Sequence, residues 1–191
     1  MAARGASASA GRADAQPASG WTWPEDPTAV ICCGEGLPEA ARAALEAAGH
    51  SYGDPDRCRR LLASASALAP DHPATLIGEY RFHFYGGRLD EALAVGQRAL
   101  AWAARAARLA LDWRQVRGGD ARFGDFDAAL PRFYLFCLKG CGYLRARLGD
   151  REGGAQMLDK LCELDPADRL GGQALLRVLA RQGRSDDDES D

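Results

Sequence analysis

The chain has 191 residues, of which 47% are hydrophobic and 27% charged, and its formal net charge is −3. These values predict one helical domain with a core of ordinary size, and no apolar run approaches the ~20 residues of a membrane-spanning helix. Five of the acidic residues lie in 185–191, and setting them aside leaves the body at +2. A nearly neutral body without a basic stripe argues against nucleic acid as the main partner.

Residues 1–27 have a low-complexity composition without the apolar stretch of a secretory signal, so we expect a disordered tail. The segment 28–38 contains an apolar run and the pair Gly34 and Gly36, but lacks the third glycine of a dinucleotide-binding loop. We therefore expect it to form a turn that leads into the first helix. Strong preference for arginine over lysine and the lack of asparagine favour a G+C-rich bacterial genome and a cytoplasmic location.

Three glycines divide the central part of the chain into periodic units. Gly53, Gly87 and Gly149 are separated by 34 and then 62 residues, each between two segments with apolar residues at helical spacing. A separation of 62 equals one 34-residue period plus 28 inserted residues. The sequence therefore predicts helix-turn-helix repeats over 39–72, 73–106 and 135–168, with an insertion over 107–134.

Aspartates mark the predicted helix starts. Asp54 precedes Pro55, Asp150 follows a glycine turn, and Asp165 precedes Pro166, so each is expected to cap the N-terminus of a helix. The last of these helices is a capping helix over 168–183 that covers the end of the array. It completes a domain over 28–183, and residues 184–191 are expected to form an acidic disordered tail.

Two stretches, 87–93 and 161–168, resemble the most recognisable parts of the tetratricopeptide repeat (TPR) family. The resemblance implies an all-α, TPR-like solenoid of about three helix-turn-helix repeats plus a C-terminal capping helix. The second repeat departs from the family pattern, because Glu79 and Tyr80 stand where a large aliphatic residue and a small residue are usual. This departure leaves open a shift of that helix by one position.

In the TPR family the first helix of each repeat lines a concave groove. The resemblance implies a non-enzymatic adaptor, scaffold or chaperone-like module that binds a protein or peptide partner with apolar anchors and carboxylates. The aromatic members of the groove set have a second interpretation as core residues. The predicted partner-binding residues are Ile77, Arg81, Phe84, Tyr85, Lys139, Tyr143 and Arg147.

The insertion is expected to extend the preceding helix through Leu111 and then to run as a surface loop until Pro131 starts the next helix. Its aromatic residues Trp113, Phe123 and Phe126 have two open interpretations. They either cover the groove and anchor a partner or pack over the edge of the solenoid.

The six cysteines lack the spacing of a zinc site, and we interpret them as core thiols, with no metal or other cofactor expected. Cys137 and Cys141 lie one helical turn apart and are the remaining candidates for a soft metal, together with Cys32 and Cys33. The run 133–171 is similar to small repeat proteins associated with bacterial nitrogen-fixation clusters. This similarity implies an alternative function in metalloenzyme assembly or maturation. No catalytic constellation is present, so we do not expect an enzyme.

Overall fold

The computed structural model describes residues 36–125 and 127–188, and the predicted tail over 1–27 lies outside this range. In the described part there are seven α-helices and no strand, which confirms the all-α prediction for these residues. None of these helices has the length and apolar character needed to cross a bilayer. The elements are α2 (Glu39–Gly49), α3 (Pro55–Leu68), α4 (Pro73–Tyr85), α5 (Leu89–Ala106), the 3-10 helix η1 (Trp113–Gln115), α6 (Ala129–Arg147), α7 (Arg151–Leu164) and α8 (Gly172–Asp188).

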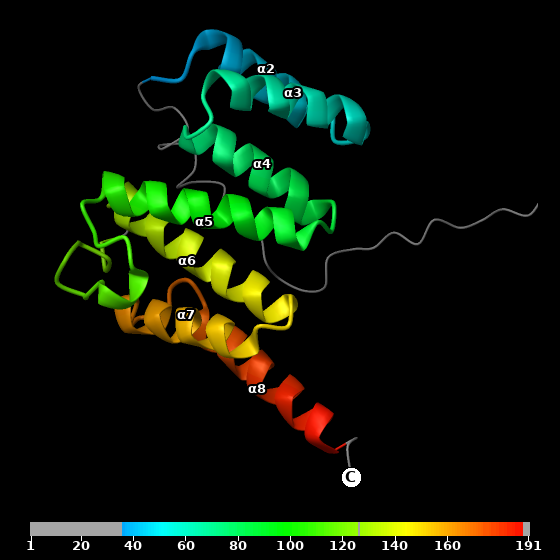
Figure 1. The fold of residues 1–191 in the computed structure, drawn as a ribbon. Coiled ribbons are helices and arrows are strands. Elements are labelled where there is room, and N and C mark those ends of the chain that lie inside the picture. Colours follow the sequence, from blue (N-terminus) through cyan, green and yellow to red (C-terminus); the bar gives the residue numbers. More distant parts are fainter. Residues whose placement is uncertain (1–35, 126, 189–191) are drawn as a thin grey trace, which may run out of the picture.

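The helices form a row in sequence order from α2 to α8, each against the next (Figure 1). Short turns join α2 to α3, α4 to α5 and α6 to α7, and these three turns lie along one edge of the row. We call this the turn edge. The connection from α3 to α4 and the long one from α5 to α6 lie along the opposite edge. The C-terminal ends of α2, α4 and α6 are therefore all at the turn edge.

Two of the three predicted glycine turns have the same conformation. Gly87 and Gly149 are left-handed, with φ of +71° and +95°. In both turns the residue after the glycine donates its amide hydrogen to the carbonyl of the residue four positions before the glycine. This bond satisfies a carbonyl that the helix end would leave unpaired. Gly53 does not have a positive φ. Helix α2 ends at Gly49, so its turn to α3 is longer than the turn from α4 to α5. The longer turn needs no left-handed residue at Gly53.

Two of the three predicted aspartate caps are confirmed. The carboxylates of Asp54 and Asp150 each accept a hydrogen bond from the amide three residues later, at 3.0 and 2.9 Å. The prediction for Asp165 is wrong, because no helix begins at Pro166. Asp165 instead follows the end of α7 and accepts a hydrogen bond from the amide of Leu170, which orders the connection to α8.

Helix α5 ends at Ala106 and not at the predicted Leu111. Arg108 adopts the left-handed conformation, with φ of +57°, and the amide of Leu109 donates to the carbonyl of Ala104 at 2.8 Å. A non-glycine residue in this conformation costs about 1–2 kcal/mol. The hydrogen bonds of the turn and the burial of Leu109 offset that cost.

The boundaries of α6 and α8 also differ from the predictions. Helix α6 begins at Ala129, so Pro131 lies in its first turn, where a missing amide hydrogen leaves no bond unmade. Helix α8 continues past Gly183 to Asp188, so the start of the predicted tail over 184–191 is helical. A glycine inside a helix costs only about 1 kcal/mol relative to alanine, which is too little to end it. The last three residues of the chain lie outside the described part.

The pairing of large and small side chains shows that α4 is not shifted in register. Tyr80 is 3% exposed and packs against Gly96 of α5, where an added Cβ would lie 3.3 Å from the tyrosine ring. At the equivalent place in the next pair, Gly142 faces Leu158, and an added Cβ would lie 3.1 Å from that side chain. A large residue on α4 is thus accommodated by a small residue on α5.

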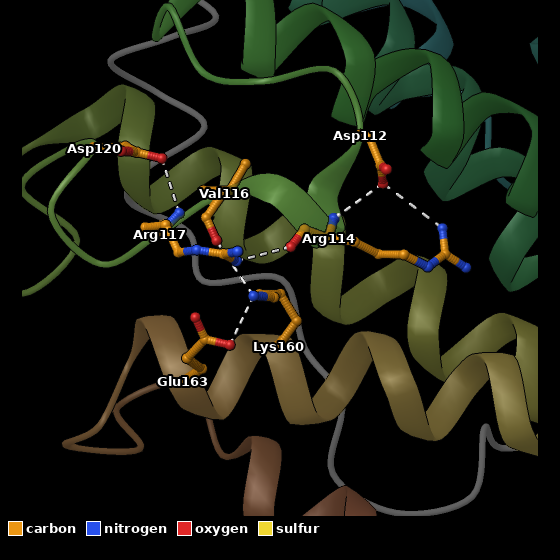
Figure 2. Close-up of polar contacts among 7 residues, drawn as sticks. All are labelled: Asp112, Arg114, Val116, Arg117, Asp120, Lys160 and Glu163. Atoms are coloured by element: carbon orange, nitrogen blue, oxygen red, sulfur yellow. Dashed lines mark hydrogen bonds and ion pairs between the residues drawn. The ribbon is translucent and has the colours of Figure 1, made fainter.

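The insertion packs over the edge of the row, which decides between its two interpretations. Val116 is fully buried and Phe123 is 7% exposed, while Phe126 lies outside the described residues. Figure 2 shows Lys160 of α7 reaching the insertion, where its Nζ donates to the carbonyl of Val116 at 3.3 Å. The same ammonium forms an ion pair with Glu163 at 2.6 Å.

Hydrogen bonds within the insertion stabilise its conformation. Asp112 accepts from the amide of Arg114, and Asp120 accepts from the amide of Arg117 (Figure 2). A second hydrogen bond to the insertion comes from the connection between α7 and α8, where the guanidinium of Arg169 donates to the carbonyl of Gly124 at 2.9 Å. The insertion therefore covers the N-terminal end of α6, at the edge opposite the turn edge.

Candidate protein-binding surface

Four of the predicted binding residues meet where α4 and α6 end. The ring centroids of Phe84 and Tyr143 are 6.2 Å apart, and those of Phe84 and Tyr85 are 5.5 Å apart in an edge-to-face arrangement. Arg147 donates from Nη1 to the hydroxyl of Tyr143 at 2.7 Å. These contacts join two helices from different predicted repeats, so only the folded row brings them together.

Tyr52 and Arg81 extend this cluster along the turn edge. Arg81 lies one helical turn before Tyr85 on α4, and Tyr52 lies in the turn after α2. Burial raises the pKa of Tyr52, and the charge of Arg81 acts in the opposite direction. Tyr52 and Tyr85 are each 50% exposed. We use the name aromatic patch for Tyr52, Arg81, Phe84, Tyr85, Tyr143 and Arg147.

The patch combines cations and tyrosines in a regular way. Arg81 and Tyr85 lie one turn apart on α4, and Tyr143 and Arg147 lie at the equivalent places on α6. Neither arginine forms an ion pair with a carboxylate in the part of the chain that the structure describes. The patch can therefore offer positive charge and aromatic surface to the same ligand.

Two other predicted binding residues, Ile77 and Lys139, are engaged by neighbouring elements: Ile77 is buried, and Lys139 is partly buried against the connection before α8. Ile77 is 4% exposed and lines a small internal cavity together with residues of α5 and α6. Lys139 donates from Nζ to the carbonyl of Leu170, and burial lowers the pKa of Lys139, while Asp168 acts in the opposite direction. Both positions lie one helical turn before the patch, where neighbouring elements cover them. The cluster at the ends of α4 and α6 therefore does not include them.

Arg88, in the turn between α4 and α5, has a structural role. Its guanidinium donates to the carbonyl of Phe82 at 2.8 Å and to Nδ1 of His83 at 3.2 Å. It also lies over the ring of Phe82, 4.3 Å from the centroid. A charge reversal at Arg88 would disturb this turn, so Arg88 is unsuitable as a neutral control for changes in the patch.

The cysteine pair on α6 is buried in the core. Cys137 is 4% exposed and Cys141 is fully buried. Burial raises the pKa of the Cys137 thiol, and it raises the pKa of Cys141 to about 12. Since a soft metal binds the thiolate, this environment disfavours binding. No three His, Cys, Asp or Glu side chains are grouped for a metal among the described residues, and Cys32 and Cys33 lie outside them.

Sequence reasoning missed Tyr52 as a member of the patch. The assignment of groove positions used only the first helix of each predicted repeat, and Tyr52 lies in the turn after α2. The one available signal was an aromatic residue beside Gly53 in an otherwise polar turn. Its proximity to α4 depends on how the first two helix pairs stack, which local sequence does not determine.

Comparison with curated proteins found a relative of this chain. The chain is 42% identical over 120 residues to a protein named "Uncharacterized 19.8 kDa protein in nifW 5'region", from Azotobacter chroococcum mcd 1. The alignment covers 62% of this chain and 67% of the relative. No family model matches the chain, and no solved structure matches it.

Proposed function

The chain belongs to the same family as the uncharacterized 19.8 kDa protein of the nifW 5′ region, and we propose that it is a non-enzymatic protein-interaction module. Its binding surface is the aromatic patch at the turn edge. The helix pairs α2–α3, α4–α5 and α6–α7 are the repeats of a TPR-like solenoid, and α8 is the capping helix. The common turn conformation at Gly87 and Gly149 and the aspartate caps support this assignment.

The observation that carries the proposal is the composition of the patch. Tyrosine and arginine are the residue types that most often dominate the energetics of protein interfaces, together with tryptophan. Here two half-exposed tyrosines lie beside arginines that form no ion pair with a carboxylate within the described residues. A protein segment with an apolar anchor and carboxylates complements this surface.

Site-specific cross-linking tests the proposal. A photoreactive amino acid at Tyr85 should capture a defined partner in the native host, and Leu68 is the matched control because its exposure of 49% is close to the 50% of Tyr85. Leu68 lies at the end of α3, on the edge opposite the turn edge. Equal capture from both positions would contradict the proposal.

The captured partner then allows an affinity measurement. The double variant Arg81→Glu/Arg147→Glu should bind about tenfold or more weakly, because it reverses both patch charges. Arg105→Glu, an exposed change at the far end of α5, should bind as the unaltered chain does. Circular dichroism verifies that each variant is folded. Unchanged affinity of the double variant at low salt would remove the patch as the binding surface.

A second proposal concerns the biological context. The name of the relative places it in the nifW 5′ region, and nif designates nitrogen-fixation genes, which favours a role in the assembly or maturation of a metalloenzyme. In this version the partner is a nitrogen-fixation protein and binds at the patch. Direct metal handling by Cys137 and Cys141 is the less favoured version, because both thiols are buried. Stoichiometric metal in protein purified without oxygen would reverse that preference.

A further inference from the structure

The aromatic patch has chemistry that restricts its occupant. Its half-exposed tyrosines favour contact with flat apolar side chains, and Arg81 and Arg147 favour carboxylates. A suitable occupant is a short segment that carries aromatic residues next to acidic residues and has no nearby lysine or arginine.

The chain itself contains such a segment outside the described residues. Trp21 and Trp23 are followed, after Pro24, by Glu25 and Asp26. No lysine or arginine occurs between Arg12 and Arg42. The segment 21–26 therefore supplies two large aromatic anchors and two carboxylates, with no charge that would be repelled by the patch.

The connection to the described part is long enough. Trp23 lies 13 residues before Gly36, the first described residue, so an extended connection reaches about 43–47 Å. Gly36 precedes α2, whose C-terminal end is at the turn edge, and the 11 residues of α2 measure about 16 Å. Crossing from α2 to α4 and on to α6 adds about 8–10 Å for each helix. The whole path is about 32–36 Å, which is shorter than the extended connection.

We propose that residues 21–26 dock on the aromatic patch of the same chain, with the tryptophans against the tyrosines and the carboxylates beside Arg81 and Arg147. The proposal rests on the patch being the binding surface described under the proposed function. An external partner must then displace this segment, so its apparent affinity is reduced by the fraction of chains with an open patch. The N-terminal segment thus acts as an intramolecular competitor.

Fluorine NMR of the full chain with 5-fluorotryptophan tests the docking directly. The chain has four tryptophans, and single tryptophan-to-phenylalanine changes assign their signals. We expect the signals of Trp21 and Trp23 to be displaced from the positions of an unstructured peptide. Arg81→Glu/Arg147→Glu and Tyr85→Ala should return both signals to those positions, whereas Arg105→Glu should not.

Trp102 and Trp113 are internal controls for folding, because both pack against the core and lie away from the patch. Their signals should be the same in all variants. If Trp21 and Trp23 already give unstructured-peptide positions in the unaltered chain, the docking proposal is overturned. It is also overturned if their displacement grows with protein concentration, since the occupant would then be the segment of a second copy.

A partner measurement separates this inference from the proposed function. Trp21→Ala/Trp23→Ala should increase the affinity for the cross-linked partner about tenfold, which corresponds to ~1.4 kcal/mol of lost competition. If patch variants abolish partner binding while both tryptophan signals stay unstructured, the proposed function stands and the docking fails. If the tryptophan signals respond to patch variants while partner binding does not, the docking stands and the proposed function fails.

Discussion

The pair α4–α5 and the pair α6–α7 fill the same space between helices with side chains of opposite size. In the first pair Tyr80 projects from the first helix against Gly96 of the second, and in the other pair Gly142 faces Leu158. The positions are equivalent, because each lies at the same distance from the left-handed glycine of its pair. We call the contact between the two helices of a pair its seam. Two facing residues share the volume at the seam, so a departure from a repeat pattern at one position can be compensated at the other.

The equivalence extends to polar residues that no repeat pattern specifies. Arg98 of α5 donates to the carbonyl of Pro70 at 2.6 Å, and Lys160, at the equivalent place on α7, donates to the carbonyl of Val116. In these two pairs the second helix thus holds the connection that enters the pair. The same place in the pair performs this task whether the connection is a short turn or the long insertion.

Breaking the seam of the first pair should have the largest effect. Tyr80→Ala leaves a cavity and should destabilise the fold by about 3–5 kcal/mol, and Gly96→Leu should cost about 1–3 kcal/mol through overpacking. The double variant should lose less than the sum, by about 1 kcal/mol or more, because the new leucine fills the space of the tyrosine. Urea unfolding measures this coupling, and strict additivity would show that the two positions do not share volume.

The seam of the second pair is less tolerant, because backbone approaches backbone there. A Cβ at Gly154 would lie 2.7 Å from the carbonyl oxygen of Gly142. Gly154→Ala should therefore destabilise the fold by about 2–3 kcal/mol, although alanine favours helix. Gly119→Ala in the insertion, where an added Cβ meets nothing within 4 Å, is the control. Similar midpoints of thermal unfolding for the two variants would refute the close approach.

Lys160 and Arg98 each bind a connection between helices, the first through a buried contact and the second through an exposed one, and their removal should have different effects. The Lys160 side chain is 10% exposed, whereas 43% of the Arg98 side chain is exposed. Lys160→Met should cost about 1–2 kcal/mol, because the carbonyl of Val116 loses its donor. Trypsin should then cut faster at the arginines of the insertion. Arg98→Met should cost less than 1 kcal/mol, and a larger loss than for Lys160→Met would contradict this order.

The smallest expected effect is a difference in pH dependence between the turn that joins α4 to α5 and the turn that joins α6 to α7. Burial, followed by the charge of Arg88, lowers the pKa of His83 below 6.5, whereas hydrogen bonding from Arg145 lowers that of Asp150 below 3.8. The folded-state pKa of each group is lower than its ordinary pKa. Each group's contribution to the stability of the fold is therefore complete above its ordinary pKa and is lost as the pH falls through its folded-state pKa. NMR signals of the first turn should therefore change below pH 6.5, and those of the second only below pH 3.8. Simultaneous changes would contradict the assignment.

The sequence predicted the features of this fold that depend on local chemistry. Asp54 and Asp150 cap helices because the cap requires only the amide three residues later, and Gly87 needs only its own conformational freedom. The end of α5 was missed because an arginine takes the left-handed position, and its cost is offset by burial of Leu109. That compensation depends on tertiary packing, which local patterns do not contain.

The candidate site was predicted in part for the same reason. The resemblance to the TPR family implied Arg81 and Tyr85 on α4 and Tyr143 and Arg147 on α6, and helical spacing keeps each pair on one face of its helix. The burial of Ile77 depends on how α5 and α6 cover α4. That the seven helices of residues 36–125 and 127–188 form a TPR-like solenoid stays a prediction, since it rests on the resemblance of short motifs.

The chain has only two lysines, Lys139 and Lys160, and both donate to backbone carbonyls of irregular segments. Mild acylation of the intact protein therefore has two ε-amine targets, each of which reports on a different contact. Modification at Lys160 follows opening of the insertion, and modification at Lys139 follows release of the connection before α8. The lowered pKa of Lys139 increases its neutral, reactive fraction, so slow acylation there would arise from the contact and not from protonation.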